Sequence, residues 1–153
     1  MKIAVGADHA GLPLKETVIA RIAALAHTPV DLGAHEYDAN DDYPDFALAV
    51  ASEVAQGRAD RGVVLCGSGV GASIVANKVR GVRAGVCHDT YSARQGVEHD
   101  DMNVLCIGSR IIGSAIADSV IAAFVGATFT GEERHARRLE KVKAIEASGD
   151  LSE

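Results

Sequence analysis

A cysteine followed by a glycine-rich segment is the part of this sequence best suited to chemistry. The segment consists of Cys66, Gly67, Ser68, Gly69, Val70 and Gly71. Glycines let a backbone approach a ligand closely, and N–H groups at the start of a helix can bind an anion. A helix N-terminus also favours the thiolate form of a nearby cysteine, so Cys66 could act as a nucleophile or as a base toward a carbon acid. The glycines alone would equally suit a tightly packed turn.

The segment matches neither of the two common nucleotide-binding loops. A dinucleotide fingerprint follows the first strand of its unit, and a Walker loop ends in Gly-Lys-Ser or Gly-Lys-Thr. Cys87 and Cys106 lie in or at the end of apolar runs, which predicts that both are buried packing residues. The three cysteines form no CxxC pair and no even disulfide framework. This usage favours a reducing, cytoplasmic location and argues against a redox enzyme or a thiol hydrolase.

Two histidines lie next to acids at predicted strand boundaries. Asp8 and His9 follow the apolar run 2–7, and His99 is followed directly by two aspartates. A histidine exchanges protons near neutral pH, and neighbouring carboxylates favour its protonated form. Asp8 lies too far from the helical pattern that begins at Leu14 to be its obvious cap, which favours a ligand-binding role. The alternative is that both histidines are solvated surface residues.

Basic side chains are concentrated in the last part of the chain. Arg134 and Arg138 are one helical turn apart, so they share a face and could hold one phosphate. Arg110, directly after an apolar run, is better placed as a single phosphate ligand. A charged terminal helix is otherwise usually a solvated surface element.

Strand-like and helical patterns alternate along the sequence. Short apolar runs predict strands at 2–7, 30–33, 62–66, 83–87 and 103–107. Helical spacing predicts helices from Leu14 onward and at 46–56, 72–79, 90–98, 113–125 and 132–147. Asp45 is predicted to cap the second helix and Gly57 to end it. This order implies a parallel sheet covered on both faces, with ligands at the carboxyl ends of its strands. That edge would gather residues 8–9, 66–71, 88–89 and 108–110.

Composition and charge narrow the class of protein. The chain has 153 residues, of which 48% are hydrophobic and 24% charged, and this is typical of one compact domain. Aromatic residues make up 4%, which disfavours stacking on bases, and the net charge of −6 argues against nucleic acid or an anionic membrane as partner. A charged residue interrupts the first apolar run, unlike a secretion signal, and the apolar stretch 115–129 is too short to span a membrane.

The predicted closing helix carries an apolar stripe as well as its charges. Leu139, Val142 and Ile145 recur at helical spacing. The helix follows the fifth strand and its covering helix, so it has no place in the sheet layers, and the stripe needs another surface. We therefore expect residues 131–148 to contact a partner subunit, with the two arginines of this helix reaching that subunit's site. The alternative is a helix that folds back on its own chain.

Six segments, in this order, resemble the ribose-5-phosphate isomerase B family and its galactose-6-phosphate isomerase relatives. They read GADHAG, DYPDFA, CGSGVGASIVANK, VCHDTYSA, HDDMNVLCIGSRIIG and ERHARRLEKVKAIE, and they extend over nearly the whole chain. The resemblance implies a Rossmann-like three-layer α/β/α fold around a five-stranded parallel sheet. It also implies a homodimer, sometimes a homotetramer, that interconverts an aldose and a ketose phosphate through a cis-enediolate without cofactor or metal.

The family pattern implies a role for each matching residue. Cys66 matches the base that moves a proton between C1 and C2 of ribose 5-phosphate, and His99 matches the acid–base group that opens the sugar ring. The Ser68 hydroxyl and the amides of the glycine-rich segment would hold the enediolate oxygen. Asp8 would bind substrate hydroxyls, with Tyr43 at the border of the site. The residues expected around the phosphate are His9, Arg110, Arg134 and Arg138, the last two from the partner subunit.

Three positions depart from the usual pattern of this family. Some members use a glutamate where this chain has Ala72, so the mechanism based on Cys66 is favoured here. Ser68 replaces the commoner threonine and keeps the hydroxyl. Asp100, expected beside the substrate, replaces an asparagine, and a carboxylate would repel an enediolate, so the preferred sugar phosphate stays open. A tetrose, allose or galactose phosphate would use the same residues, whereas a non-catalytic phosphosugar-binding protein would need neither Cys66 nor His99.

Overall fold

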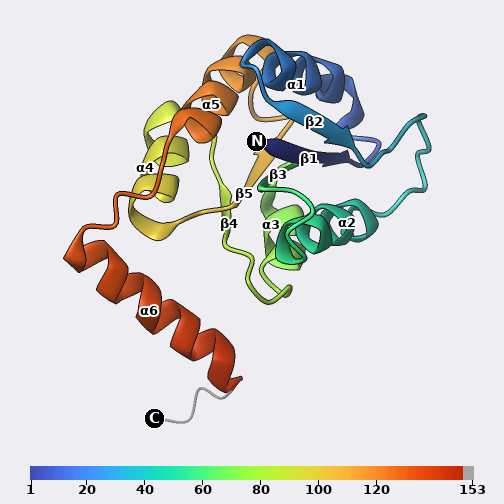
Figure 1. The fold of residues 1–153 in the computed structure, drawn as a ribbon. Coiled ribbons are helices and arrows are strands. Elements are labelled where there is room, and N and C mark those ends of the chain that lie inside the picture. Colours follow the sequence, from blue (N-terminus) through green and yellow to red (C-terminus); the bar gives the residue numbers. More distant parts are fainter. Residues whose placement is uncertain (150–153) are drawn as a thin grey trace.

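Five parallel strands form the centre of the computed structural model, which describes residues 1–149 (Figure 1). The strands are β1 Lys2–Ala7, β2 Thr28–Asp31, β3 Arg61–Cys66, β4 Ala84–Val86 and β5 Val104–Gly108. Their order in the sheet is β2-β1-β3-β5-β4, so β3 is central and β2 and β4 are the edges. All neighbouring strands pair in parallel, as the alternation of strands and helices predicted.

Helices cover both faces of the sheet. They are α1 Leu12–Ala24, α2 Tyr43–Ala55, α3 Val70–Ala76, α4 Thr90–Asp100, α5 Ser114–Gly126 and α6 Glu133–Ser148. The buried residues of α1, α4 and α5 form one apolar core with the sheet, and those of α2 and α3 form a second core on its other face (Figure 1). This is the predicted three-layer α/β/α arrangement.

Apolar side chains alternate between the two cores along the central strand. In β3, Val63 and Leu65 belong to the core under α1, α4 and α5, whereas Val64 and Cys66 belong to the core under α2 and α3. Successive side chains of a strand point to opposite faces, so a strand covered on both sides must be apolar throughout. The same alternation directs Cys66 toward the α2 and α3 layer.

The start of α2 differs from the sequence prediction. The helix begins earlier, at Tyr43, and its N-cap position is Asp42. The prediction that Asp45 caps this helix is therefore wrong, because Asp45 lies inside the first turn. Pro44 explains the difference, since proline has no N–H to satisfy and its fixed φ suits the first helical turn. The helix ends just before Gly57, as predicted.

Most other elements differ from the prediction by one to three residues at an end, and the differences in β2, α1 and α4 have a physical reason or a consequence for the site. The strand β2 includes Pro29, which an edge strand tolerates because one side of its backbone is unpaired. The helix α1 begins at Leu12, with Pro13 in its first turn. The helix α4 continues to Asp100, so His99 lies in the last turn of a helix and not in a loop.

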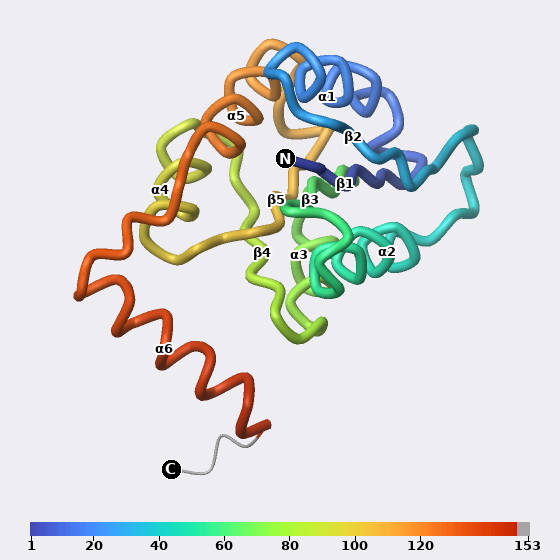
Figure 2. The backbone as a smooth tube through the Cα atoms, in the orientation of Figure 1, coloured from blue at the N-terminus to red at the C-terminus, as the bar shows by residue number. Residues whose placement is uncertain are grey.

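The helix α6 lies outside the three layers. It contacts α4 and extends toward the loop between α3 and β4 (Figure 2). Leu139 of its apolar stripe is buried, whereas Val142 and Ile145 are 50% and 57% exposed. The chain therefore covers only the beginning of this stripe. No helix in residues 1–149 is long and apolar enough to cross a membrane.

Candidate active site

The carboxyl end of β3 opens into a crevice because the helices that follow β3 and its neighbours diverge. α3 follows β3 into one layer, whereas α1 and α5 follow β1 and β5 into the other. Open parallel sheets bind ligands where their connections diverge in this way. A cavity of about 330 Å³ lies at this point. It is lined by Asp8, Tyr43, Cys66, Gly67, Ser68, Gly71, Arg110 and Ile111.

Cys66 is the cysteine that borders this cavity. Its side chain is buried, and the N–H of Gly69 donates a hydrogen bond to Sγ at 3.1 Å. The glycine-rich segment therefore holds the sulfur in place at the border of the cavity. Cys87 and Cys106 are buried away from the cavity, as predicted, and burial raises the pKa of the Cys87 thiol to about 11. Burial also raises the pKa of Cys106, so both remain neutral thiols near neutral pH.

The glycine-rich segment is shaped by two close approaches. Gly69 has a φ of +82°, in the left-handed region that favours glycine, and it precedes the first residue of α3. A Cβ on Gly71 would lie 2.7 Å from the ring of Tyr43, so the glycine lets this ring close one side of the cavity. The Oγ of Ser68 accepts the N–H of Val70 at 3.3 Å, which leaves the hydroxyl proton available to a ligand.

Asp8 lines the cavity and also fixes the loop after β1. It is 6% exposed, and its Oδ1 accepts the N–H of Gly11 at 2.8 Å, immediately before α1. As expected, Asp8 is not the N-cap of α1: the N-cap position is Gly11, and no side chain caps it, although the helix begins earlier than predicted. One carboxylate both orders the loop and faces the space for a ligand.

His9 is paired with Asp41, a residue that sequence reasoning did not single out. The His9 Nδ1 lies 2.6 Å from Asp41 Oδ1. This hydrogen bond raises the pKa of His9; burial opposes the rise, Asp8 adds to it and Arg110 lowers it. Atoms of Asp8, His9 and Asp41 lie within 4.8 Å of one another, as metal ligands could. The 2.6 Å separation leaves no room for an ion between the two, so we interpret His9 and Asp41 as a hydrogen-bonded ion pair.

The end of β5 closes the cavity with Arg110 and Ile111. The N–H groups of Ser109 and Arg110 donate to the carbonyls of Cys66 and Gly67 at 2.8 and 3.1 Å, which ties this segment to the glycine-rich segment. The Arg110 side chain is exposed and passes close to Gly67. An exposed guanidinium beside a cavity is well suited to bind a phosphate. Ile111 was not predicted, since an apolar side chain carries no chemical signature in a sequence.

A second cluster of predicted residues lies where α4 meets α6. The His99 Nδ1 lies 2.8 Å from the Nε2 of Gln95, and the His99 ring stacks on that of His135 with 3.9 Å between centroids. His135 is buried, and burial lowers its pKa, with His99 and Arg134 lowering it further. Arg134 and Arg138 are exposed on α6.

We call His99, Asp100, Arg134 and Arg138 the histidine half-site. The cysteine half-site consists of the residues that line the 330 Å³ cavity together with His9, Gly69 and Val70.

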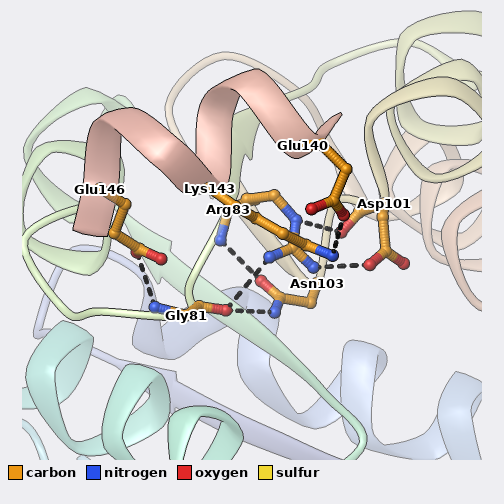
Figure 3. Close-up of polar contacts among 7 residues, drawn as sticks. All are labelled: Gly81, Arg83, Asp101, Asn103, Glu140, Lys143 and Glu146. Atoms are coloured by element: carbon orange, nitrogen blue, oxygen red, sulfur yellow. Dashed lines mark hydrogen bonds and ion pairs between the residues drawn. The ribbon is translucent and has the colours of Figure 1, made fainter. Parts of the chain in front are cut away.

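A hydrogen bond from the segment after α3 holds α6 against the rest of the chain beside the histidine half-site (Figure 3). The Oε1 of Glu146 accepts the N–H of Gly81 at 2.7 Å. Further hydrogen bonds join Gly81, Arg83, Asp101 and Asn103. A groove of about 500 Å³ remains between α6 and this segment, and Asp100, Val142 and Ile145 are among the residues that line it.

The two half-sites lie at opposite ends of the sheet. Cys66 pairs with Gly108 at the carboxyl end of β5, whereas His99 lies in the last turn of α4, which leads to Val104 at the amino end of β5. The span from Val104 to Gly108 is about 13 Å at the rise of a parallel strand. His99 is accordingly absent from the residues that line the Cys66 cavity. Within one chain, the two predicted catalytic residues do not share a site.

The chain is similar to known sugar-phosphate isomerases over most of its length. Residues 3–142 match the family model described as Ribose/Galactose Isomerase. The ribose-5-phosphate isomerase B of Escherichia coli is 43% identical over 145 residues, which cover 95% of this chain and 96% of that protein. A D-erythrulose-4-phosphate isomerase of Pectobacterium atrosepticum is 40% identical over 112 residues, which cover 73% of this chain and 74% of that protein.

A solved structure of a relative has the same fold. The ribose-5-phosphate isomerase B of Mycoplasma genitalium with bound ribulose-5-phosphate superimposes with a TM-score of 0.91 at 39% identity. The match covers 95% of this chain and 96% of that one. The predicted family resemblance is confirmed by sequence and by structure: this chain belongs to the ribose/galactose isomerase family and is a sugar-phosphate isomerase.

Proposed function

We propose that the protein interconverts ribose 5-phosphate and ribulose 5-phosphate through a cis-enediolate. The observation that carries the proposal is the position of Cys66 in a cavity shared with Ser68 and Arg110. Proton transfer beside a carbonyl needs a base and donors for the developing oxygen anion, and a phosphate needs a cation. Similarity to the E. coli ribose-5-phosphate isomerase B, and to a structure that holds ribulose-5-phosphate, supports this choice of substrate.

Cys66 is the base in this proposal. Its thiolate takes the proton from C2 of the open-chain aldose, and the electron pair of that C–H bond forms the C1–C2 double bond while O1 becomes the enediolate oxygen. The proton of O2 then moves to O1, and the thiol returns its proton to C1, which leaves the ketone at C2. The Ser68 hydroxyl and the N–H groups of residues 67–71 would stabilise the oxygen anion, as in an oxyanion hole.

The remaining residues of the cysteine half-site would bind the two ends of the substrate. Asp8, whose carboxylate lines the cavity, would accept hydrogen bonds from the sugar hydroxyls. Arg110, which lines the cavity, and His9, which lies within electrostatic range of Arg110, would bind the phosphate. Tyr43, whose ring packs beside Gly71, would border the sugar.

We further propose a homodimer in which the histidine half-site of each chain completes the cysteine half-site of the other. His99 lies too far from Cys66 to serve the cavity of its own chain. Val70, Ile74 and Ile111, on or near the cysteine half-site, are 52%, 57% and 58% exposed, so this surface is apolar and uncovered. A two-fold arrangement makes both contacts at once, since each chain offers the same pair of surfaces. Arg134 and Arg138 would then join Arg110 around the phosphate.

A panel of aldose phosphates, assayed for ketose formation with EDTA present, tests the substrate. We expect the highest kcat/KM for ribose 5-phosphate, with tetrose, allose and galactose phosphates lower by about tenfold or more, because a tetrose fills the pocket poorly and a hexose is one carbon too long for it. Asp100→Asn in the same panel should raise turnover of ribose 5-phosphate if the carboxylate faces the enediolate. Preference for the tetrose phosphate would favour an activity like that of the Pectobacterium relative. No ketose from any aldose phosphate would indicate a binding protein.

The variant His99→Asn separates ring opening from proton transfer. Ribose 5-phosphate closes into a furanose, whereas ribulose 5-phosphate has its O5 phosphorylated and cannot close a five-membered ring. We expect turnover of ribose 5-phosphate to fall about 10²–10⁴-fold, the usual contribution of a positioned acid–base group. Exchange of the C1 proton of ribulose 5-phosphate with D2O, followed by NMR, should fall less than about tenfold because Cys66 performs it. Equal losses would show that His99 has another role.

A further inference from the structure

Asp41 links the two loops that border the cysteine half-site. It lies between β2 and α2, just before Tyr43, and its Oδ1 contacts the ring of His9 at Nδ1, 2.6 Å away. The same oxygen accepts the backbone N–H of His9 at 3.1 Å. One carboxylate oxygen therefore fixes both the backbone and the ring of this histidine. A contact this short between a ring nitrogen and a carboxylate is typical of a charged pair.

The burial of Asp41 favours a charged partner. Its side chain is 10% exposed, and its Oδ2 is buried with no hydrogen-bond partner among residues 1–149. A buried carboxylate is costly unless a nearby cation compensates its charge. The imidazolium of His9 is the cation that contacts it. The pair thus stabilises the charged form of His9.

The geometry leaves the second nitrogen of His9 available. Because Nδ1 faces Asp41, Nε2 lies on the far side of the ring from this carboxylate, and the His9 side chain is 27% exposed. Tyr37 packs edge-on against the ring, with 6.0 Å between centroids. The other charged groups that act on His9 are Asp8 and Arg110. An anion bound by Arg110 can therefore receive a second charge-assisted hydrogen bond from Nε2.

We propose that Asp41 is a positioning residue that holds His9 as an imidazolium, with its Nε2–H directed to the phosphate bound by Arg110. Asp41 does not contact the substrate itself and acts through His9. The identity of the anion as a sugar phosphate rests on the proposed function, whereas the contact between Asp41 and His9 is independent of it.

The charge of His9 makes this role dependent on pH. The hydrogen bond to Asp41 raises the pKa of His9, against the opposing effect of burial, while Asp8 raises it and Arg110 lowers it. The imidazolium is therefore present below this raised pKa and is lost as the pH rises through it. Without Asp41, the loss occurs at lower pH. Loss of Asp41 should consequently weaken phosphate binding most at alkaline pH, where His9 of the variant is neutral.

The variant Asp41→Asn tests the proposal, because the amide keeps a hydrogen-bond acceptor for the ring but removes the charge. We expect KM for ribose 5-phosphate at pH 8 to rise about tenfold, because fewer His9 rings then carry the charge that binds the phosphate, with kcat changed less than about threefold. The His9 ring signals in NMR should titrate at lower pH than in the wild type. Asp38→Asn is the matched control, since the Oδ1 of Asp38 accepts the N–H of Asn40 in the same exposed loop and is not bonded to His9.

Two further measurements keep the test decisive. The affinity for inorganic phosphate, read from NMR shifts, should fall with Asp41→Asn even if the protein turned over no sugar phosphate, so failure of the proposed function would be distinguishable. If Asp41→Asn did not fold, the wild type alone would suffice, because its His9 should titrate at higher pH than an unperturbed histidine. An ordinary titration of His9, or unchanged KM and phosphate affinity in a folded Asp41→Asn protein, would overturn the proposal.

Discussion

Replacing Cys66 with alanine is expected to lower kcat about 10²–10⁴-fold while KM for ribose 5-phosphate stays within about threefold of wild type. The thiol is the group of the cysteine half-site that accepts a hydrogen bond from Gly69 and borders the cavity, so its removal eliminates the proposed base. Asp8 and Arg110, which would bind the substrate, remain in place. Steady-state kinetics should show the loss, and exchange of the C1 proton of ribulose 5-phosphate with D2O should be lost in parallel.

Cys87→Ala is the matched control for this experiment. Cys66 and Cys87 are both 5% exposed, but Cys87 packs in the core on the other face of the sheet. Burial raises the pKa of the Cys87 thiol to about 11, so it is neutral at the pH of the assay. Its removal should cost about 1 kcal/mol of stability through a small cavity and leave kcat within about twofold. Near-normal turnover by Cys66→Ala would refute the assignment of the base.

Mixing two inactive variants, Cys66→Ala and His99→Asn, is expected to restore about a quarter of the wild-type activity once subunits exchange. In a hybrid dimer with shared sites, one site receives both defects and the other receives neither. Random pairing makes half of the dimers hybrids, and each hybrid has one intact site of two. If Cys66 and His99 served the same chain, every site would keep one defect and activity would stay at the level of the mutants.

A chain that carries both substitutions provides the control for this mixing. When it is mixed with an equal amount of wild type, shared sites leave only the wild-type homodimers active, so activity falls to about a quarter of that of wild type alone at the same total concentration. If each site were confined to one chain, the mixture would keep about half of the activity of wild type alone at the same total concentration. Native mass spectrometry of chains with different tags would establish that exchange has occurred, and the two mixtures together distinguish the models.

Much of the fold could be predicted because its signals are local. The run from Gly62 to Cys66 is apolar at every position, as a strand buried on both faces requires, and the structure confirms it as the core of β3. The start of α2 was missed because Asp45 looked like a cap, although Pro44 already occupied a position in the first turn. Competing local signals of this kind are resolved only by the packing of the whole helix.

The site was less predictable because its contacts are distant in sequence. The pairing of His9 with Asp41 depends on the path of the loop before α2, and no spacing rule relates the two residues. His99 was expected in one site with Cys66, but strand order and helix direction place it at the other end of the sheet. Resemblance to a family correctly identified a sugar-phosphate isomerase, whereas the roles of the individual residues stay predictions, and the resemblance did not show which chain supplies each of them.

The placement of Cys66 and His99 at opposite ends of one sheet has a consequence for the rate law. The span between these ends is fixed by the paired backbone of β3 and β5, so no rearrangement of side chains can bring the two residues together within one chain. If catalysis needs both, a lone chain carries two incomplete sites and turns over nothing. At protein concentrations below the dissociation constant of the dimer, the rate then varies with the square of the protein concentration. The activity per chain therefore depends on how much of the protein is present.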